Sequence, residues 1–406
     1  MRILYIAYSC SPIHGSEDAI GWNIPVVSAR EDMVFVITKE EQRPYIEAYA
    51  REYDLKNLHF YYVDIPAVYK KLFRGPFYSG RLNIWHRRAE KLAREICRTE
   101  KIDLIHQITP VEFRSVGNYG RIPGAKFVCG PIAGGQRIPR CLMAYMERSR
   151  YVEWVREAIN WAFRFLFHIS GKYKSCACVL FANGETRDFL KNMHITTLGE
   201  PARTEVGIQE NEICSGPRQD SGKENCCRLL VAGRLVPLKG HRGLLDALKQ
   251  LPPDLNYQCC IVGEGAEREQ LEKKCLEYGL EGRVSFAGMI PYQQMHAEYA
   301  HADVLVFPSL REATGTVILE AMAKGLPVVA MNGFGGATIL DDSCGWLYDG
   351  DSRERYIKNL KEILTACIRN PEEVRRRGEN ARIRAADFTW EKKNEYYHSI
   401  YRRVLD

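Results

Sequence analysis

Short apolar runs alternate with amphipathic segments along most of the chain. The first run ends in a loop rich in serine, proline and glycine, which is typical of a buried parallel strand. Because a helical segment separates each run from the next, the pattern predicts an α/β fold with doubly wound parallel sheets. In the first half, the predicted strands are residues 2–8, 34–38, 59–63, 103–107, 126–129 and 178–181.

The alternation stops in mid-chain and then resumes. Residues 208–227 are polar and interrupted by glycine and proline, which predicts a linker between two domains. We therefore expect an N-terminal domain over residues 1–207, a C-terminal domain over residues 228–385, and a last helix over residues 386–406 that can cross back to the first domain. The predicted strands of the second half are residues 228–232, 257–262, 283–286, 304–307 and 327–330.

Length, composition and charge agree with two soluble domains. A chain of 406 residues is too long for one ordinary core. With 46% hydrophobic and 27% charged residues, it has the composition of a globular protein rather than of a disordered or fibrous one. The net charge of +6 favours anionic ligands or an acidic membrane surface, and it does not by itself indicate nucleic acid.

Cysteine and apolar patterns indicate a cytoplasmic protein with reduced thiols. The 14 cysteines occur in a long chain that opens with a strand and shows no secretory signal, so we expect no disulfide framework. Adjacent pairs such as Cys259 and Cys260 lack the spacing of a zinc knuckle. The apolar stretch closest to a membrane span, residues 154–167, is interrupted by charged residues, so we expect a soluble or peripheral protein.

The first candidate site is a loop with two cations. Ligands of open parallel sheets bind beyond the carboxyl ends of the strands. The loop after the strand at residues 228–232 holds Arg234 and Lys239 just before a helix. A guanidinium grips two oxygens and an ammonium adds a point charge, so the pair suits a diphosphate. The alternative is two solvated surface cations.

The most informative loop follows the strand at residues 304–307. A helix is predicted from Thr316, so free amides of its first turn point toward an anion. Glu312 lies in the loop and Glu320 inside the helix, too far apart to act as one carboxylate pair. We expect each to accept hydrogen bonds from the hydroxyls of a different part of one extended ligand. The alternative, an acidic residue favoured by the helix dipole, explains Glu312 alone.

The loop at residues 262–265 contains two glycines of a dinucleotide fingerprint. Arg268 occupies the position of the third glycine, so the signal for a dinucleotide is weak. Two glycines permit either a close backbone approach to a ligand or a tight turn.

Glu312, seven further residues, and Glu320 followed by Ala-Met-Ala resemble the E-x7-E signature of the retaining GT-B enzymes of glycosyltransferase family 4. The glycine-rich opening around Gly15 and Gly21 and the stretch at residues 130–135 resemble members that build bacterial envelope polysaccharides. The resemblance implies a GT-B fold, with two Rossmann-like domains facing a central cleft and the donor held mainly by the second.

The resemblance also implies a role for each site residue. Arg234 and Lys239 would hold the diphosphate, Glu320 the ribose and Glu312 the donor sugar. His106 is the local candidate for a histidine that assists at the sugar, and a core histidine is the alternative. Many members carry aromatic residues where Ala313 and Thr314 stand here, which implies a different shape of the sugar pocket. The remaining donor-binding positions are Gly15, Gly233, Gly263, Met289, Ile290, Thr314, Gly315 and Thr316.

The expected reaction is retaining transfer of a hexose from a nucleotide diphosphate sugar to a hydroxyl of a glycan or lipid-linked acceptor, in surface polysaccharide biosynthesis. The cations and helix amides would stabilise the departing phosphate, and a phosphate oxygen can take the proton. No cofactor is expected, and the resemblance favours a UDP-sugar. No metal is expected, because the D-x-D at residues 349–351 precedes a helix and Asp351 is better interpreted as its N-cap.

Two alternatives to a transferase stay open at this point. One is another GT-B enzyme, a sugar-nucleotide epimerase or a phosphorylase. The other is a catalytically silent protein that binds nucleotide sugars.

The acceptor side is expected on the first domain. Residues 69–74 and 154–167 mix basic with large apolar side chains, which is typical of a surface that docks on a membrane. The hypothesis is peripheral attachment at the inner face of the plasma membrane, near a lipid-linked acceptor. The alternative is a core helix plus a solvated basic loop.

Overall fold

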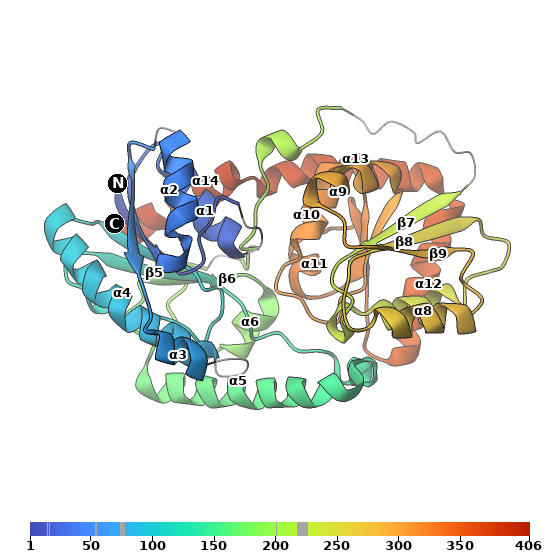
Figure 1. Ribbon diagram of the computed structural model, residues 1–406, viewed down its shortest axis with the longest axis horizontal. Coiled ribbons are helices and arrows are strands. Elements are labelled where there is room, and N and C mark those ends of the chain that lie inside the picture. Colours follow the sequence, from blue (N-terminus) through green and yellow to red (C-terminus); the bar gives the residue numbers. More distant parts are fainter. Residues whose placement is uncertain (14, 16, 53–54, 74–77, 200, 217–225) are drawn as a thin grey trace. The chain divides into compact units, whose positions relative to one another are not determined.

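The computed structural model contains two compact units, each built on one sheet with flanking helices (Figure 1). It describes the chain except for residues 14, 16, 53–54, 74–77, 200 and 217–225. The first unit consists of Met1–Gln136, Val155–Gly207 and Trp390–Asp406. The second unit consists of Arg137–Trp154 and Ile208–Thr389.

The first unit contains a six-stranded parallel sheet in the order β3-β2-β1-β4-β5-β6. The central strand β4 is buried along its whole length, as expected for an apolar run covered by helices on both faces. The strands are β1 (Arg2–Ala7), β2 (Met33–Lys39), β3 (Leu58–Val63), β4 (Leu104–Thr109), β5 (Lys126–Ile132) and β6 (Cys178–Phe181). The helices are α1 (Glu17–Ser28), α2 (Arg43–Glu52), α3 (Ala67–Leu72), α4 (Tyr78–Glu100), α5 (Arg150–Ser170, whose first turn belongs to the second unit), α6 (Gly184–Phe189) and α14 (Trp390–Leu405).

The second unit repeats this topology, with the strand order β12-β11-β10-β7-β8-β9. In both sheets the first and fourth strands of the unit lie side by side at the centre, and this is the switch point where such folds bind ligands. The strands are β7 (Cys227–Ala232), β8 (Tyr257–Val262), β9 (Val284–Gly288), β10 (Val304–Phe307), β11 (Val328–Met331) and β12 (Gly345–Tyr348). The α-helices are α7 (His241–Leu248), α8 (Arg268–Glu277), α9 (Tyr292–His301), α10 (Thr316–Ala323), α11 (Phe334–Ile339), α12 (Arg353–Arg369) and α13 (Pro371–Ala385).

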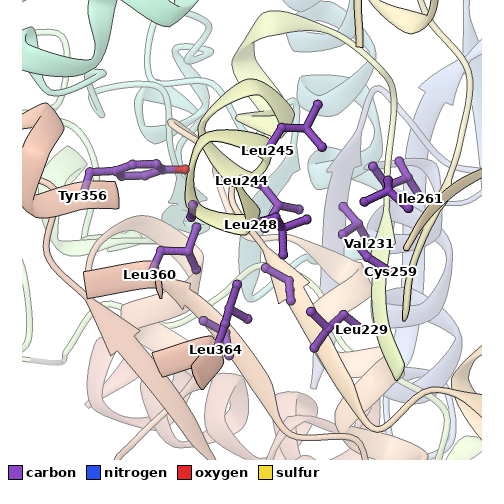
Figure 2. Packing of buried hydrophobic residues seen from close by; sticks show 14 of the residues in the cluster. Leu229, Val231, Leu244, Leu245, Leu248, Cys259, Ile261, Tyr356, Leu360 and Leu364 are labelled. Carbon is purple, nitrogen blue, oxygen red and sulfur yellow. The ribbon is translucent and has the colours of Figure 1, made fainter. Parts of the chain in front are cut away.

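The core of the second unit forms where two helices cover the sheet. In α12, Tyr356, Leu360 and Leu364 recur at helical spacing and are fully buried. Figure 2 shows them with Leu244 and Leu248 of α7 and with apolar side chains of β7 and β8. This packing fixes the strands whose carboxyl ends carry the predicted site.

The doubly wound architecture is confirmed for both halves, but two elements differ from the prediction. Strand β12 was not predicted, because a four-residue run with a glycine and a tryptophan has little strand signal of its own. Residues 137–154 were expected in the first domain and instead belong to the second unit. The reason is that Leu142 and Tyr145 are buried in the second core, where the Tyr145 hydroxyl donates a hydrogen bond to Asp246 at 2.9 Å.

The predicted linker lies only partly within the described residues. Its central part, 217–225, lies outside them. The part before it pairs with the second unit: Ile208 forms a bridge with Thr389, and the amide of Cys214 donates to Ala323 at 2.9 Å. The last helix, α14, belongs to the first unit and contacts α1 there.

All 14 cysteines lie within the described residues and are free thiols. Within the same residues, no helix combines the length and the apolar character needed to cross a bilayer.

Candidate functional site

Four neighbouring loops of the second unit meet at the carboxyl edge of its sheet. They follow β10, β7, β8 and β9, which are adjacent in the sheet, and all predicted donor-site residues of this unit except Glu320 lie in them or in the first residue of α10. The loops bond directly to one another. The amide of Leu235 donates to Glu264 at 2.9 Å, and the amide of Leu310 donates to Leu238 at 2.9 Å. The predicted residues therefore share one edge.

Two glycines allow these loops to approach so closely. Gly263 has a φ of 139°, and a Cβ there would lie 1.9 Å from the Gly233 carbonyl oxygen. Gly240 has a φ of 73°, and a Cβ there would lie 1.9 Å from the Pro308 carbonyl oxygen. Any side chain at either position would push two site loops apart. The second glycine of the β8 loop, Gly265, also permits a close loop contact, because a Cβ there would lie 2.3 Å from the Leu235 carbonyl oxygen.

Lys239 and Glu312 form an ion pair between the loop after β7 and the loop after β10. Both side chains are partly exposed, and the Lys239 ammonium also lies 5.5 Å from the centre of the Phe307 ring. The pair holds the ammonium at the switch point of the sheet. From the sequence, Lys239 and Glu312 were expected to bind different parts of a ligand, and this direct contact between them was not predicted.

Arg234 stands on the same loop as Lys239 but is exposed. Within the described part of the chain its guanidinium has no ion pair. Its donors are therefore available to an anion, and a guanidinium can bind phosphate oxygens in a bidentate manner.

Glu320 is the fifth residue of helix α10. The Tyr299 hydroxyl of α9 donates to Glu320 Oε2 at 2.7 Å. Burial raises the pKa of Glu320, while the hydrogen bond from Tyr299 lowers it and the charge of Glu212 raises it further. Close by, the Tyr292 hydroxyl donates to Glu212 at 3.0 Å. A half-buried carboxylate with one hydroxyl donor retains acceptor capacity for a ligand hydroxyl.

The start of α10 contains a buried hydroxyl with no partner. Thr314 is 2% exposed, and among the described residues its Oγ1 has no hydrogen-bond partner. Gly315 is the N-cap in the left-handed region, and Thr316 is the first helical residue. Unpaired buried hydroxyls are rare in proteins, so Thr314 is a candidate to meet a ligand oxygen.

Met289 and Ile290 directly follow β9 at the same edge of the sheet. Met289 is 77% exposed and Ile290 is half-buried. Most of Met289 is therefore left uncovered by the described residues.

The two predicted residues of the first unit differ from each other. Gly15 lies in the exposed loop after β1, with open space where a Cβ would stand. His106 is fully buried in β4, where its Nε2 lies 2.6 Å from the Gly130 carbonyl and its Nδ1 lies 2.6 Å from the Tyr401 hydroxyl. Since a carbonyl only accepts, Nε2 carries the proton and Nδ1 accepts from Tyr401.

This geometry favours the core-histidine alternative over the catalytic role predicted for His106. Burial lowers the pKa of His106 to about 3, so the ring stays neutral, and both ring nitrogens are already bonded within the first unit. The alternative, a core histidine, describes its surroundings. His106 is enclosed in this way because α14 supplies Tyr401, which lies 295 positions later in the sequence.

The structure also corrects the helix cap near the D-x-D. The N-cap of α12 is Ser352, whose hydroxyl accepts from the amide of Arg355 at 3.1 Å. Asp351 instead forms an ion pair with Arg355, and Asp349 accepts from Asn332 at 2.9 Å. Among the described residues, no cluster of His, Cys, Asp and Glu side chains has the arrangement of a metal site.

Three residues of interest escaped the sequence analysis. Tyr299 touches Glu320 from another helix, and no local signal marks it. Glu17 stands in the glycine-rich opening, and burial raises its pKa to about 7, although the Val111 amide donates to it at 2.6 Å. Arg311 is paired with Glu153 at 2.9 Å, within the second unit.

The second unit also contains a cavity, which lies away from the carboxyl edge of its sheet. That cavity, of about 210 Å³, is lined by the first residues of β7 and β9 and by the end of α9. It therefore lies toward the amino ends of these strands, and it contains none of the predicted residues.

Comparison with known proteins relates the second unit to glycosyl transferases. Residues 218–384 match the family model described as "Glycosyl transferases group 1". This part of the chain, which lies in the unit that holds Arg234, Lys239, Glu312 and Glu320, is therefore similar to that family.

Related sequences match mainly over part of their length. The chain is 32% identical to a D-inositol 3-phosphate glycosyltransferase of Corynebacterium glutamicum, over 43% of this chain and 42% of that protein. It is 33% identical to LpsE of Rhizobium meliloti, a lipopolysaccharide core biosynthesis glycosyltransferase, over 34% of this chain and 39% of that protein. The chain thus spans less than half the length of these two relatives.

The fold matches over the whole chain. The crystal structure of Anabaena HepE in complex with UDP superimposes with a TM-score of 0.61 and 19% identity, covering 98% of this chain and 99% of that one. At this identity the likeness shows the fold alone, which is the GT-B fold of two Rossmann-like domains.

Proposed function

We propose that the protein transfers a hexose from a nucleotide diphosphate sugar to a hydroxyl of a glycan or lipid-linked acceptor, with retention of the anomeric configuration. The observation that carries the proposal is the Lys239–Glu312 ion pair beside the exposed Arg234, on adjacent loops at the switch point of the second sheet. The similarity of residues 218–384 to the group 1 family supports a transferase. Membership of glycosyltransferase family 4 is part of the proposal and rests on the E-x7-E resemblance.

Arg234 and Lys239 bind the diphosphate in this proposal, and Glu312 both orients Lys239 and accepts from the donor sugar. Glu320 accepts from the ribose hydroxyls while Tyr299 holds its other oxygen. Thr314, Gly315 and Thr316 donate to sugar and phosphate oxygens from the start of α10. Gly233 and Gly263 give the backbone room, and Met289 and Ile290 flank the base. Gly15 of the first unit is the remaining proposed donor-binding position.

The acceptor hydroxyl attacks the anomeric carbon from the face that the diphosphate leaves. Negative charge builds on the departing phosphate, and Arg234, Lys239 and the amides of α10 stabilise it, at about 3 kcal/mol for one key donor. A phosphate oxygen takes the proton of the acceptor. His106 has no place in this step, because its ring nitrogens are occupied within the core.

The proposal requires no metal or other cofactor. The two carboxylates of the D-x-D have partners in the chain, Arg355 and Asn332. The proposed donor is a UDP-sugar; HepE, whose fold this chain shares, was crystallised with UDP.

We further propose a cytoplasmic enzyme of surface polysaccharide biosynthesis. LpsE, a relative named for lipopolysaccharide core biosynthesis, supports this process.

A thermal-shift screen with UDP, GDP, ADP and their sugars tests the donor. A nucleotide at a hundred to a thousand times its dissociation constant stabilises the fold by about 3–4 kcal/mol. We expect the uridine series to give the largest shift. A shift from none of them would contradict the proposal.

Turnover separates a transferase from a silent binding protein or an epimerase. With the preferred donor and a mixture of lipid-linked and oligosaccharide acceptors, we expect a product with the donor's anomeric configuration, unchanged by chelator. An inverted product would contradict retention. Loss of activity with chelator and its return with a divalent ion would contradict metal independence.

A further inference from the structure

Helix α5 turns its apolar side outward. Within the first unit, its exposed face consists of Val155, Trp161, Phe165, Leu166 and Ile169, here called the α5 stripe, with Ala158 and Ala162 between them. Each large side chain of the stripe is between 48% and 69% exposed. At 100° per residue these positions cover one continuous side of the helix, without a charged residue among them.

Arg156, Asn160 and Arg164 of α5 point away from the stripe. Arg156 donates to the carbonyls of Gly134 and Gln136 at 3.3 and 3.0 Å, and Asn160 donates to Gly134 at 2.9 Å. Arg164 donates to the Phe189 carbonyl at 2.7 Å. Because these bonds tie the polar face to the first unit, the helix cannot turn its apolar face inward without losing them.

Phe163 and Phe167 of α5 pack against the core of the first unit, so the helix is apolar on two sides, and the outward side lacks the polar residues of an ordinary surface helix. The alternative from the sequence, a core helix plus a solvated basic loop, does not describe this outward side. An apolar stripe held outward by specific polar contacts indicates that something apolar covers it. Trp161 lies edge-on to Phe189, with ring centres 5.4 Å apart, so its ring orientation is fixed before any partner arrives.

The charges around the stripe select the partner. Lys174, just beyond the end of α5, and Lys191, next to Arg164, are exposed. The acidic residues nearby are Glu157, half-buried on α5, and Asp188, which lies 3.8 Å from Arg187. A second copy of the chain would bring like charges together, whereas an anionic lipid surface would neutralise them.

We propose that the α5 stripe inserts into the interface of an anionic membrane, with the flanking bases on the lipid headgroups. Tryptophan and other large apolar side chains on a helix with basic flanks are typical of such in-plane insertion. This inference rests on the proposed function and deepens it. Insertion of the stripe would hold the first unit at the membrane surface, where a lipid-linked acceptor resides.

The other predicted docking segment contributes less. In α3, Val68 and Leu72 are exposed, but Lys70 is bound to Glu41 and Asp64, each at 2.8 Å. The end of that segment, Arg74, lies outside the described residues.

Co-sedimentation of the full chain with vesicles tests the proposal. We expect binding to vesicles that mix phosphatidylglycerol with phosphatidylcholine, weakened by salt, and little binding to phosphatidylcholine alone. Phe165→Ser and Ile169→Ser should each weaken binding by about tenfold, the effect of removing one large apolar side chain from the interface. Leu276→Ser on α8 and Ile383→Ser on α13, equally exposed elsewhere, are the controls and should bind as the wild type does.

Three results would overturn the proposal: no binding of the wild type to anionic vesicles, stripe variants that bind as well as the controls, or a dimer in sedimentation equilibrium that Phe165→Ser dissociates. The nucleotide thermal shift is measured on every variant. If the wild-type protein does not bind vesicles but is stabilised by a nucleotide, only the membrane docking is refuted. If it binds vesicles but no nucleotide stabilises it, only the transferase function is refuted.

Discussion

The two sheets share one strand order but keep different groups at their carboxyl edges. In the first, Gln107 and Thr109 at the end of β4 are buried and bonded to their own chain, for example Gln107 to the Ser115 carbonyl at 2.7 Å. In the second, Arg234 is exposed and the Lys239–Glu312 pair is partly exposed. The same topology thus gives a closed edge in one unit and an accessible charged edge in the other, so the fold alone does not make a site.

Removing a cation from the open edge should have the largest effect. We expect Arg234→Ala and Lys239→Ala each to lower kcat by about 10²–10³-fold, since each removes a donor to the departing phosphate. Steady-state rates with the preferred donor check this, with Lys358→Ala, an exposed lysine on α12, as the matched control. Near wild-type rates in both variants would remove the centre of the proposed mechanism.

At the closed edge of the first unit, Glu17 makes stability depend on pH. Its pKa is about 7 in the fold, above the ordinary 4.5, so the folded state binds more protons than the unfolded one between those values. Stability should therefore fall as the pH rises from 4.5 to 7, by about 3 kcal/mol at most.

Glu17→Gln should abolish that loss, because the amide oxygen still accepts from Val111 without carrying a charge. Denaturant unfolding at pH 4 and pH 8 measures the difference, and Glu95→Gln, exposed on α4, is the control. A variant no more stable than the wild type at pH 8 would refute the buried-charge explanation.

Much of this contrast could be predicted from sequence. Parallel strands are local apolar runs, so the main sheets and the loops with Arg234 and Glu312 were found correctly. Tertiary contacts decided the rest. The burial of His106 depends on Tyr401, the position of residues 137–154 depends on a core formed by later segments, and Tyr299 meets Glu320 from another helix.

His106→Ala sharpens the comparison by separating stability from catalysis. Two buried hydrogen-bond partners, Tyr401 and Gly130, lose their contacts, so we expect a loss of about 2 kcal/mol in unfolding free energy. Activity per folded molecule should change by less than tenfold. If the fold is as stable as the wild type but the rate collapses, His106 acts in catalysis after all.

The smallest expected effect is at Glu320. Glu320→Gln can still accept from Tyr299 but loses the charge that strengthens bonds from ribose hydroxyls, so nucleotide affinity should fall about fivefold, or about 1 kcal/mol. Calorimetric titration of the ribonucleotide and its 2′-deoxy analogue checks this. If the variant and the wild type prefer the ribonucleotide over its 2′-deoxy analogue by the same factor, the ribose does not bind at Glu320.

The central claim is that Arg234 and Lys239 bind the diphosphate. Its most direct test is calorimetric titration of the preferred nucleoside diphosphate and of the same nucleoside without phosphates. We expect the wild type to favour the diphosphate by about a hundredfold, the contribution of two charge-assisted contacts, and the double variant Arg234→Ala/Lys239→Ala to lose that preference. A double variant that keeps the full preference would contradict the account.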